Sequence, residues 1–516
     1  MVNRRLALRS LAGAWSVVVL VSVGCSSRAD IGSGAETAVL SIGAAAPAGT
    51  QDPGIAVLAD LLQYESLVVT GNDGRILPNL AETWNRSPDG LSWTFELRKG
   101  TRFHDGAEVT AERVTELLTE AIRNPQTVAV APSFQQVASV SQSGPSAFKI
   151  TLTRPSALLL SDLASGGVNI THGSGASSAG TGPFIIESRD DKRIAMRRFE
   201  GFRGGNPAIQ RIELNAFPTV RNAWAALMRG EIDSLYEVGP DAADFVSGES
   251  SVQTFTFLRS YIVTLGFNLK HPVLRSKEVR RALNRAIDRD AIVRAGFRGH
   301  GRPAQDPVWP QHWASSNATP RYTYNREAAA LGLASAGYAT PRASRDKVPS
   351  RFSFRCVVYQ PLERIALMVQ KQLYEIGVDM EIELAGNVDL GRRLGTGNYD
   401  AYLYWLTTAR SFTWPYLFWH SPEPGRPVFL QTGYSAADAT LEQVRYAAND
   451  GEFRIAVAAF QQVMHEDPPA VFLAWEERMR AVSQKFEVTG LEPGRDVIAS
   501  LWRWRPAEAK AAASTR

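Results

Sequence analysis

Aromatic side chains, which can stack on a flat or apolar solute, are concentrated in one stretch of the chain. Nine of them fall within residues 399–419, at Tyr399, Tyr402, Tyr404, Trp405, Phe412, Trp414, Tyr416, Phe418 and Trp419. A strand starting near Tyr399 would turn only one face toward a protein core, so core packing accounts for about half of the set. The other half is expected to face a cleft or water, where aromatic surfaces beside polar groups suit the wall of a ligand pocket.

The polar residues that an enzyme needs do not form a recognisable set. The sequence contains no Gly-x-Ser-x-Gly elbow and no glycine-rich phosphate loop that ends in Lys-Ser or Lys-Thr. His465-Glu466 begins like the helix of a zinc protease, but the second histidine is missing and Pro468-Pro469 would break that helix. The histidines, at positions 104, 172, 271, 300, 312, 420 and 465, show no metal-ligand spacing. We therefore expect no catalytic residue, no metal and no cofactor, and a site assembled from residues distant in sequence is the alternative.

The first residues have the form of an export signal. Three arginines, at positions 4, 5 and 9, precede an apolar stretch over residues 11–23 that is too short to span a membrane. This order predicts a signal peptide over residues 1–24. Residues 3–8 also resemble a twin-arginine signal, and the basic start of a general secretory signal is the alternative.

The cysteines predict a lipid anchor and no disulfide. Val21-Ser22-Val23-Gly24-Cys25 resembles a lipobox, in which lipid is attached to Cys25, although Ser22 departs from the usual leucine. An ordinary secreted protein with a stray cysteine is the alternative. Residues 25–35 are rich in Ser, Gly and Ala and predict a flexible tether. The other cysteine, Cys356, lies in an apolar run and is expected to be a small buried hydrophobic residue.

The charge balance excludes one class of partner. The chain has 56 basic and 52 acidic residues, and the signal peptide carries three of the basic ones and none of the acidic ones, which leaves 53 against 52. A net charge of +1 gives no electrostatic footprint for a nucleic acid. The remaining composition, 44% hydrophobic and 21% charged, is that of a globular protein.

The elements that must position these residues alternate between strands and helices. Leu91–Leu97 and Phe148–Leu152 alternate apolar and polar residues, as half-buried strands do. An apolar face behind a cap at Ser276 predicts a helix over 277–287. A second helix is expected over 365–376, and an alternating strand over 378–384 follows it after a glycine. Helix, glycine and strand in this order are typical of an α/β lobe.

A series of short motifs runs along the chain in a recognisable order. It begins at Leu62–Val68 and continues with Gly74-x-x-x-Pro78-x-Leu80-Ala81-Glu82-x-Trp84, Asp89-Gly90-Leu91-x-Trp93-Thr94-Phe95-x-Leu97-Arg98-x-Gly100, Phe103-His104-Asp105-Gly106, Gly180-Thr181-Gly182-Pro183-Phe184, Leu227-Met228-Arg229-Gly230-Glu231-Ile232-Asp233, Phe267-Asn268 and Ala336-Gly337-Tyr338. Together these motifs resemble, in family order, the bacterial extracellular solute-binding proteins of family 5, the dipeptide-, oligopeptide- and nickel-binding lipoproteins, and Leu62–Val68 is similar to the family's first helix. The match is looser from about residue 350 onward, where it depends on Ile376-Gly377-Val378 and Tyr399-Asp400.

The resemblance implies a two-lobed α/β periplasmic-binding-protein (Venus flytrap) fold with an inserted accessory domain. Lobe I would comprise residues 36–70, 182–265 and 487–516, the insert residues 71–181, and lobe II residues 266–486. The solute would lie between the lobes and be enclosed when they close about a hinge.

The resemblance also implies a function. The chain would be an extracytoplasmic, lipid-anchored, monomeric substrate-binding protein that delivers a peptide or similar small solute to the permease of an ABC importer. A ligand-sensing lipoprotein on the same fold, without a transport partner, is one alternative. A secreted hydrolase with an unrecognised site is the other.

The ligand contacts implied by the resemblance lie at the start of lobe II and around the strand that follows Tyr399. The expected residues are Phe267, Asn268, Tyr404, Trp405, Thr407, Thr408, Arg410 and Trp414. Peptide-binding members often carry an aspartate here that pairs with the peptide's amino terminus, but residues 401–415 contain no acidic residue. A buried ammonium without an anionic partner is costly, whereas Arg410 could bind a carboxylate or phosphate. A surface position for Arg410 is the alternative.

Overall fold

The structure, a computed structural model, describes residues 38–45, 54–165, 168–173, 175, 178–339, 350–423 and 428–508. The predicted signal peptide, Cys25 and the predicted tether lie outside these residues. No helix in the described ranges is long and apolar enough to cross a membrane.

Most strands join one mixed sheet, which has 11 strands within the described residues. Its first part surrounds β1 (Val39–Ala45), which pairs in parallel with β10 (Arg211–Phe217) and with β11 (Ser234–Val238). Two antiparallel strands, β9 (Arg193–Arg198) and β8 (Phe184–Arg189), continue this part to the edge of the sheet.

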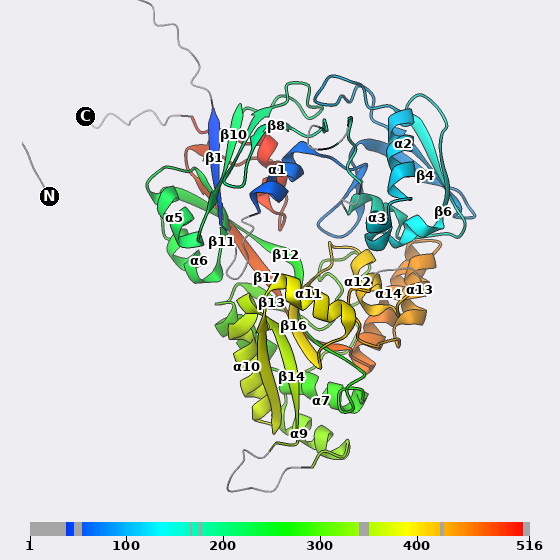
Figure 1. The fold of residues 1–516 in the computed structure, drawn as a ribbon, viewed down its shortest axis with the longest axis vertical. Helices are drawn as coiled ribbons and strands as arrows, with labels where there is room; N and C mark the ends of the chain where they lie inside the picture. The colour runs from blue at the N-terminus through cyan, green and yellow to red at the C-terminus, as the bar shows by residue number, and fades with distance from the viewer. Residues whose placement is uncertain are drawn as a thin grey trace, which may run out of the picture. The chain divides into compact units, whose positions relative to one another are not determined.

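The other end of the same sheet has a second set of parallel strands. There β14 (Phe352–Tyr359) pairs in parallel with β15 (Val378–Ala385) and β16 (Ala401–Thr407). Two long antiparallel strands, β12 (Val252–Phe267) and β17 (Ala470–Ser483), lie between the two parts in the order β16-β12-β17-β11. These two strands therefore connect both halves of the molecule, as Figure 1 shows.

A helix follows each of four parallel strands. α5 (Val220–Met228) follows β10, and α6 (Pro240–Ser247) follows β11. At the other end, α10 (Glu363–Tyr374) follows β14, and α11 (Asn387–Thr396) follows β15. Figure 1 shows α5 and α6 beside the first part of the sheet and α10 and α11 beside the second. The N-termini of these helices lie at the carboxyl ends of the strands, where open α/β sheets bind their ligands.

A separate four-stranded sheet is built from residues between β1 and β8. Its order is β4 (Ala81–Arg86), β5 (Ser92–Leu97), β7 (Ala147–Leu152) and β6 (Val137–Gln142), and α2 (Ala111–Ala121) packs on it. The remaining helices and short strands are α1 (Ile55–Gln63), β2 (Val68–Thr70), β3 (Ile76–Pro78), α3 (Pro125–Val130), α4 (Leu159–Ala164), α7 (Lys277–Ala286), α8 (Arg289–Ala291), β13 (Gly301–Pro303), α9 (Arg326–Ser335), α12 (Thr413–Trp419), α13 (Asp438–Tyr446), α14 (Asp450–Glu466), β18 (Phe486–Glu487) and β19 (Arg505–Pro506).

The buried hydrophobic side chains form four clusters in the described part of the chain. The largest extends from Leu258 to Trp475 and also includes Leu158. A second cluster holds the four-stranded sheet together, and two smaller clusters pack around β1 and against α5 and α6. Each half of the large sheet therefore has its own core.

Most of the elements predicted from the sequence are confirmed. Ser276 caps α7 by accepting a hydrogen bond from the N–H of Val279 (3.4 Å). The expectation that Leu62–Val68 forms the first helix is wrong, because α1 ends at Gln63 and the backbone is extended at Tyr64. A helix cannot continue there, since Val68 is buried as the first residue of a strand. Cys356 is fully buried, and this burial raises the pKa of its thiol.

Candidate solute-binding pocket

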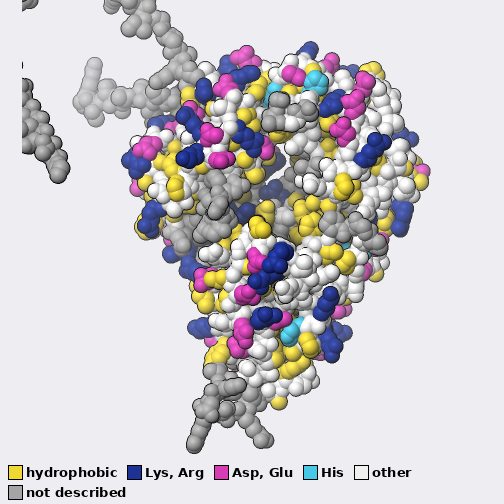
Figure 2. All heavy atoms as spheres, viewed as in Figure 1, with side chains coloured by type: hydrophobic (Ala, Val, Ile, Leu, Met, Phe, Trp, Pro, Cys, Tyr) yellow, Lys and Arg dark blue, Asp and Glu magenta, His cyan; other side chains and the backbone are white. Residues whose placement is uncertain are grey.

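A cavity of about 630 Å³ lies between the two halves of the large sheet. One wall comes from the starts of α5 and α6, at Val220, Gly239 and Ala242. The opposite wall comes from Gly296, Phe297 and the start of α10. Its size is within the roughly 300–1,000 Å³ of small-ligand sites. Figure 2 shows the surface hollowed above α11, a helix that contributes no residue to the described lining of this cavity.

The walls of the cavity are largely apolar and aromatic. Trp224 of α5, Phe245 of α6, Phe297 and Trp405 of β16 contribute aromatic rings. Phe245 is 75% exposed, so a large apolar surface faces solvent in the absence of a ligand. Such a surface gains free energy when a solute covers it, at roughly 25 cal/mol per Å² of apolar area removed from water.

Charged side chains from β11 and β17 lie among these apolar walls. The guanidinium of Arg478 donates to the carboxylate of Glu237 and, at 2.9 Å, to that of Glu476. Burial raises the pKa of Glu476. Burial alone would also raise the pKa of Glu237, but the attraction of Arg478 and Arg259 lowers it overall. The two carboxylates therefore share one arginine and differ in how readily they take up a proton.

Two buried N–H groups of the cavity residues lack an acceptor among the described residues. They are the Nε of Arg478 and the indole Nε1 of Trp405. The guanidinium carbon of Arg478 lies 5.6 Å from the centroid of the Trp405 ring, so the two side chains are neighbours. A solute with a hydrogen-bond acceptor could satisfy them, because an unpaired buried donor costs about 1–3 kcal/mol.

Of the residues predicted to contact the ligand, Trp405 lines this cavity. Tyr404, next to it on β16, points to the other face of the sheet, where its hydroxyl donates to Asn387 (2.6 Å). Thr407 ends the strand, half-buried and opposite Tyr261. The N–H of Thr408 is donated to the carbonyl of Ser260 (2.8 Å), which anchors the end of β16 to β12.

Trp414 and Arg410 follow β16 but lie apart from Trp405. Trp414, in α12, packs against Phe418 and Phe429, with ring centroids 5.4 and 5.8 Å away. Arg410 adopts a left-handed backbone (φ 58°), and its guanidinium lies over Trp309, 5.4 Å from the ring centroid. Burial and the nearby Arg495 lower the pKa of Arg410. Arg410 is therefore neither a simple surface residue nor part of the cavity lining.

The structure places Phe267 and Asn268 in the protein core. Phe267 is fully buried. The side-chain amide of Asn268 donates to the carbonyls of Gly397 (3.1 Å) and Tyr399 (2.8 Å), and its oxygen accepts from the N–H of Lys270 (3.1 Å). In this structure both side chains contact other parts of the protein, and their role as ligand contacts stays a prediction.

Sequence reasoning missed most of the cavity lining. Trp224, Phe245 and Phe297 come from three separate segments with no spacing in common. One signal was available in β17, where the apolar run Ala470–Trp475 is followed by the charged residues Glu476, Glu477, Arg478 and Arg480. Charges within a buried strand indicate a paired cluster or a polar site.

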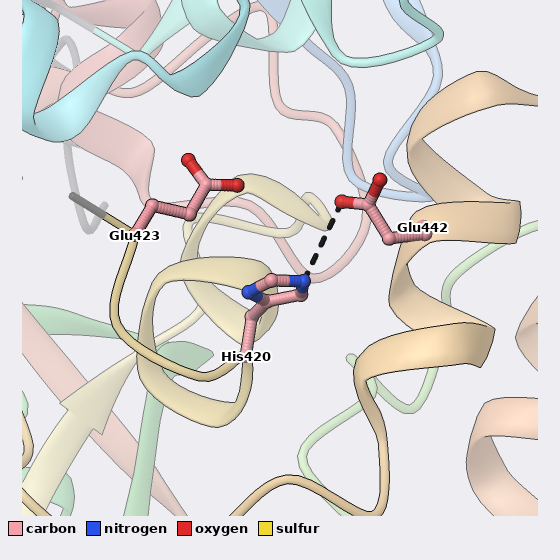
Figure 3. Close-up of side chains that lie close together, drawn as sticks. All are labelled: His420, Glu423 and Glu442. Carbon is pink, nitrogen blue, oxygen red and sulfur yellow. Dashed lines mark ion pairs between the residues drawn. The ribbon is translucent and has the colours of Figure 1, made fainter.

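One group of side chains has the spacing of a metal site. Ligand atoms of His420, Glu423 and Glu442 lie within 4.8 Å of one another, as Figure 3 shows. The guanidinium of Arg445 lies 2.9 Å from Glu423 and 3.5 Å from Glu442. The hydroxyl of Tyr416 lies 2.5 Å from the carboxylate of Glu423 and 2.8 Å from that of Glu442, and can donate its one proton to either. Arg445 thus balances one of the two negative charges, and a metal ion would have to compete with this arginine for both carboxylates.

An apolar cavity between two α/β halves, with a helix N-terminus at each wall, defines the class of protein. The class is that of two-lobed solute-binding proteins. The sequence profile of "Bacterial extracellular solute-binding proteins, family 5 Middle" matches residues 75–425. The chain belongs to this family, whose members are extracytoplasmic binding proteins.

Relatives and solved structures agree with this assignment. The chain is 24% identical to the oligopeptide-binding protein AppA of Bacillus subtilis over 475 residues, which cover 86% of each chain. The structure of AppA from Bacillus subtilis in complex with a nonapeptide matches with a TM-score of 0.74 at 21% identity, covering 91% of this chain and 99% of that one. NikA from Brucella suis in complex with Fe(III)-EDTA matches with a TM-score of 0.77 at 20% identity, covering 90% and 100%. These structures show the fold.

Proposed function

We propose that the protein is the substrate-binding component of an ABC importer and that its solute binds in the 630 Å³ cavity. The observation that carries the proposal is the position of this cavity, between the helix N-termini of the two halves of a family 5 fold. Trp405 supplies one wall from β16 and is the predicted ligand contact that the cavity includes. Tyr404, Thr407, Thr408, Arg410 and Trp414 stay predictions that a structure with bound solute would test.

The division into lobes is part of the same proposal. Lobe I would comprise 36–70, 182–265 and 487–516, the insert 71–181, and lobe II 266–486. The separate hydrophobic clusters of the two sheet halves and of the four-stranded sheet support a division into three parts. Near the limits the packing crosses over: Leu258 to Leu265 pack in the lobe II cluster, and Met479 to Phe486 pack in the lobe I clusters.

We further propose that β12 and β17 act as the hinge. A solute that contacts both walls binds the closed state better than the open one, and this difference shifts the population toward closure. Small-angle scattering should then give a smaller radius of gyration with solute bound, and an unchanged radius at saturation would contradict closure.

We propose that the solute is a peptide or a similar small molecule. The relative AppA is named for oligopeptides, whereas NikA was solved with an iron chelate. Family membership therefore leaves a range of ligands open, and the chemistry of this cavity has to decide among them.

Import is tested by the solutes that cells remove from their medium. Wild-type cells should deplete at least one solute that a deletion strain leaves behind, as measured by mass spectrometry of the spent medium. A gene encoding Trp405→Ala should restore depletion less well than the wild-type gene, because the large side chain would no longer form its wall. Equal depletion by the deletion strain would contradict an import function and would favour a sensing role.

A further inference from the structure

The cavity has a charge pattern that restricts its ligand. Its lining contains three arginines, Arg221, Arg364 and Arg478, and two glutamates, Glu237 and Glu476. We infer that the solute is an amphipathic carboxylate, with an apolar body, a free carboxylate and no free ammonium group. This inference rests on the proposed function, because it takes the cavity as the solute site.

An ammonium group has no anionic partner available in the described lining. Both carboxylates of the described lining, Glu237 and Glu476, already form ion pairs with Arg478. A ligand ammonium would have to compete with Arg478 for one of them and would leave the buried arginine undercompensated. Breaking a buried ion pair in this way costs about 3–5 kcal/mol. An unmodified peptide, which carries an ammonium at its amino terminus, should therefore bind with a less favourable free energy than an acylated one.

A ligand carboxylate, in contrast, could accept hydrogen bonds from two N–H groups of the cavity lining. The Nε of Arg478 and the Nε1 of Trp405 are buried without an acceptor among the described residues, and both side chains line the cavity. Arg478 is only 8% exposed, so little water competes for this position. The two oxygens of one carboxylate could accept from two such neighbouring donors, and hydrogen bonds to a charged acceptor contribute about 1.5–3 kcal/mol.

The net charge around the cavity also favours an anion. The guanidinium of Arg259 lies 5.6 Å from the ring centroid of Trp405 and, together with Arg478, balances the two glutamates. Arg221 then adds a positive charge at the exposed edge of the cavity. Positive charge at the entrance raises the local concentration of anions.

The remaining lining fits an apolar body. Trp224 and Phe245 on one wall face Phe297 and Ile365 on the other. Aromatic and branched aliphatic groups are the moieties that gain most from such walls. N-acylated amino acids or dipeptides and aromatic or aliphatic carboxylic acids have this combination of an apolar body and one carboxylate.

Four dipeptides with one shared skeleton test the charge pattern at both ends. They are phenylalanyl-leucine, its N-acetyl form, and the C-terminal amide of each, with affinities measured by titration calorimetry on the solute-free protein. We expect N-acetyl-phenylalanyl-leucine, with its free carboxylate, to bind tightest. Its amide and the unacetylated dipeptide should each bind at least tenfold more weakly, which is about 1.4 kcal/mol. Tighter binding by either dipeptide with a free amino terminus overturns the inference, and so does failure of all four to bind at millimolar concentration.

Two variants test the donors. Trp405→Phe keeps an aromatic ring and removes the N–H, and Arg478→Lys keeps the charge beside the glutamates and removes the Nε. Each should weaken the acetylated acid by about tenfold and its amide by less. Trp502→Phe, on a segment outside this cavity, is the matched control and should leave all four affinities unchanged.

The outcomes separate this inference from the proposed function. If Trp405→Ala weakens all four compounds equally, the cavity is the solute site but the carboxylate has no role there. If Trp405→Ala alters the binding of none of the compounds that bind, the cavity is not the site, and the proposed location of the solute is wrong together with the inference.

Discussion

At the scale of single residues, the protein keeps several polar side chains in places where burial is costly. Arg478 is stabilised by two carboxylates, yet its Nε and the neighbouring indole N–H of Trp405 have no acceptor in the described structure. Unpaired buried donors of this kind are rare in folded proteins unless a ligand or water satisfies them. These atoms are therefore where a bound solute would contribute most to affinity.

His312 is a second buried polar residue and gives a prediction about pH. Its ring packs at right angles on Phe412, with centroids 5.2 Å apart, and its Nδ1 accepts from the N–H of Ala314. Burial lowers the pKa of His312 to about 4, whereas an unfolded histidine titrates near 6.5. The folded state therefore binds a proton less readily than the unfolded state between these values.

Acidification should therefore lower the free energy of unfolding of the protein. The stability associated with neutral His312 is fully present above pH 6.5 and is lost as the pH falls toward 4, by up to about 3 kcal/mol. Urea unfolding of wild type and of His312→Gln, measured at pH 7 and at pH 4.5, should show a smaller loss on acidification for the variant. Equal losses in the two proteins would show that His312 is not a source of acid sensitivity.

At the scale of elements, the two halves of the large sheet are joined where β12 packs closely against β16. Gly266 of β12 pairs with Tyr402 of β16 and with Ala470 of β17. A Cβ at this position would lie 2.1 Å from the Cζ of Tyr402, which is fully buried and cannot swing into solvent. The pairing of β12 with β16 thus requires a residue without a side chain at position 266.

Gly266→Ala should accordingly lower the free energy of unfolding by about 1–3 kcal/mol, the typical cost of overpacking a core. The control is Gly386→Ala, where no atom outside the adjacent residues lies within 4 Å of the new Cβ. Chemical unfolding of both variants measures the difference. A Gly266→Ala protein as stable as the control would mean that the crossing strands tolerate separation at this point.

Elements with a strong local pattern could be predicted from the sequence, and the cavity could not. The cap at Ser276 and the helix–glycine–strand order around Gly377 are local features, and the structure has α7, α10 and β15 at these places. The cavity combines residues from α5, α6, α10, β16 and β17, and long-range pairing of strands decides which of them meet. The burial of Phe267 and the hydrogen bonds of Asn268 to the carbonyls of Gly397 and Tyr399 likewise depend on tertiary packing and could not be predicted from their neighbours in sequence.

At the scale of the whole molecule, the proposed role requires the binding domain to stay close to a membrane permease. Cys25 lies outside the described residues, and its lipidation is a prediction from the sequence. A single acyl chain holds a protein only marginally, whereas two or three chains anchor it firmly. Fractionation of cells that produce Cys25→Ser should find the protein released or as an uncut precursor. A processed variant that remains in the membrane fraction would disprove the lipid anchor.

The central claim is that the cavity between the two sheet halves holds the solute. It is tested most directly by extracting small molecules from wild type and Trp405→Ala, purified side by side without denaturation, and comparing them by mass spectrometry. We predict a small molecule in the wild-type extract that is reduced at least tenfold in the variant, because the wall of the cavity is lost. The same molecule retained in equal amount by both proteins would contradict the claim.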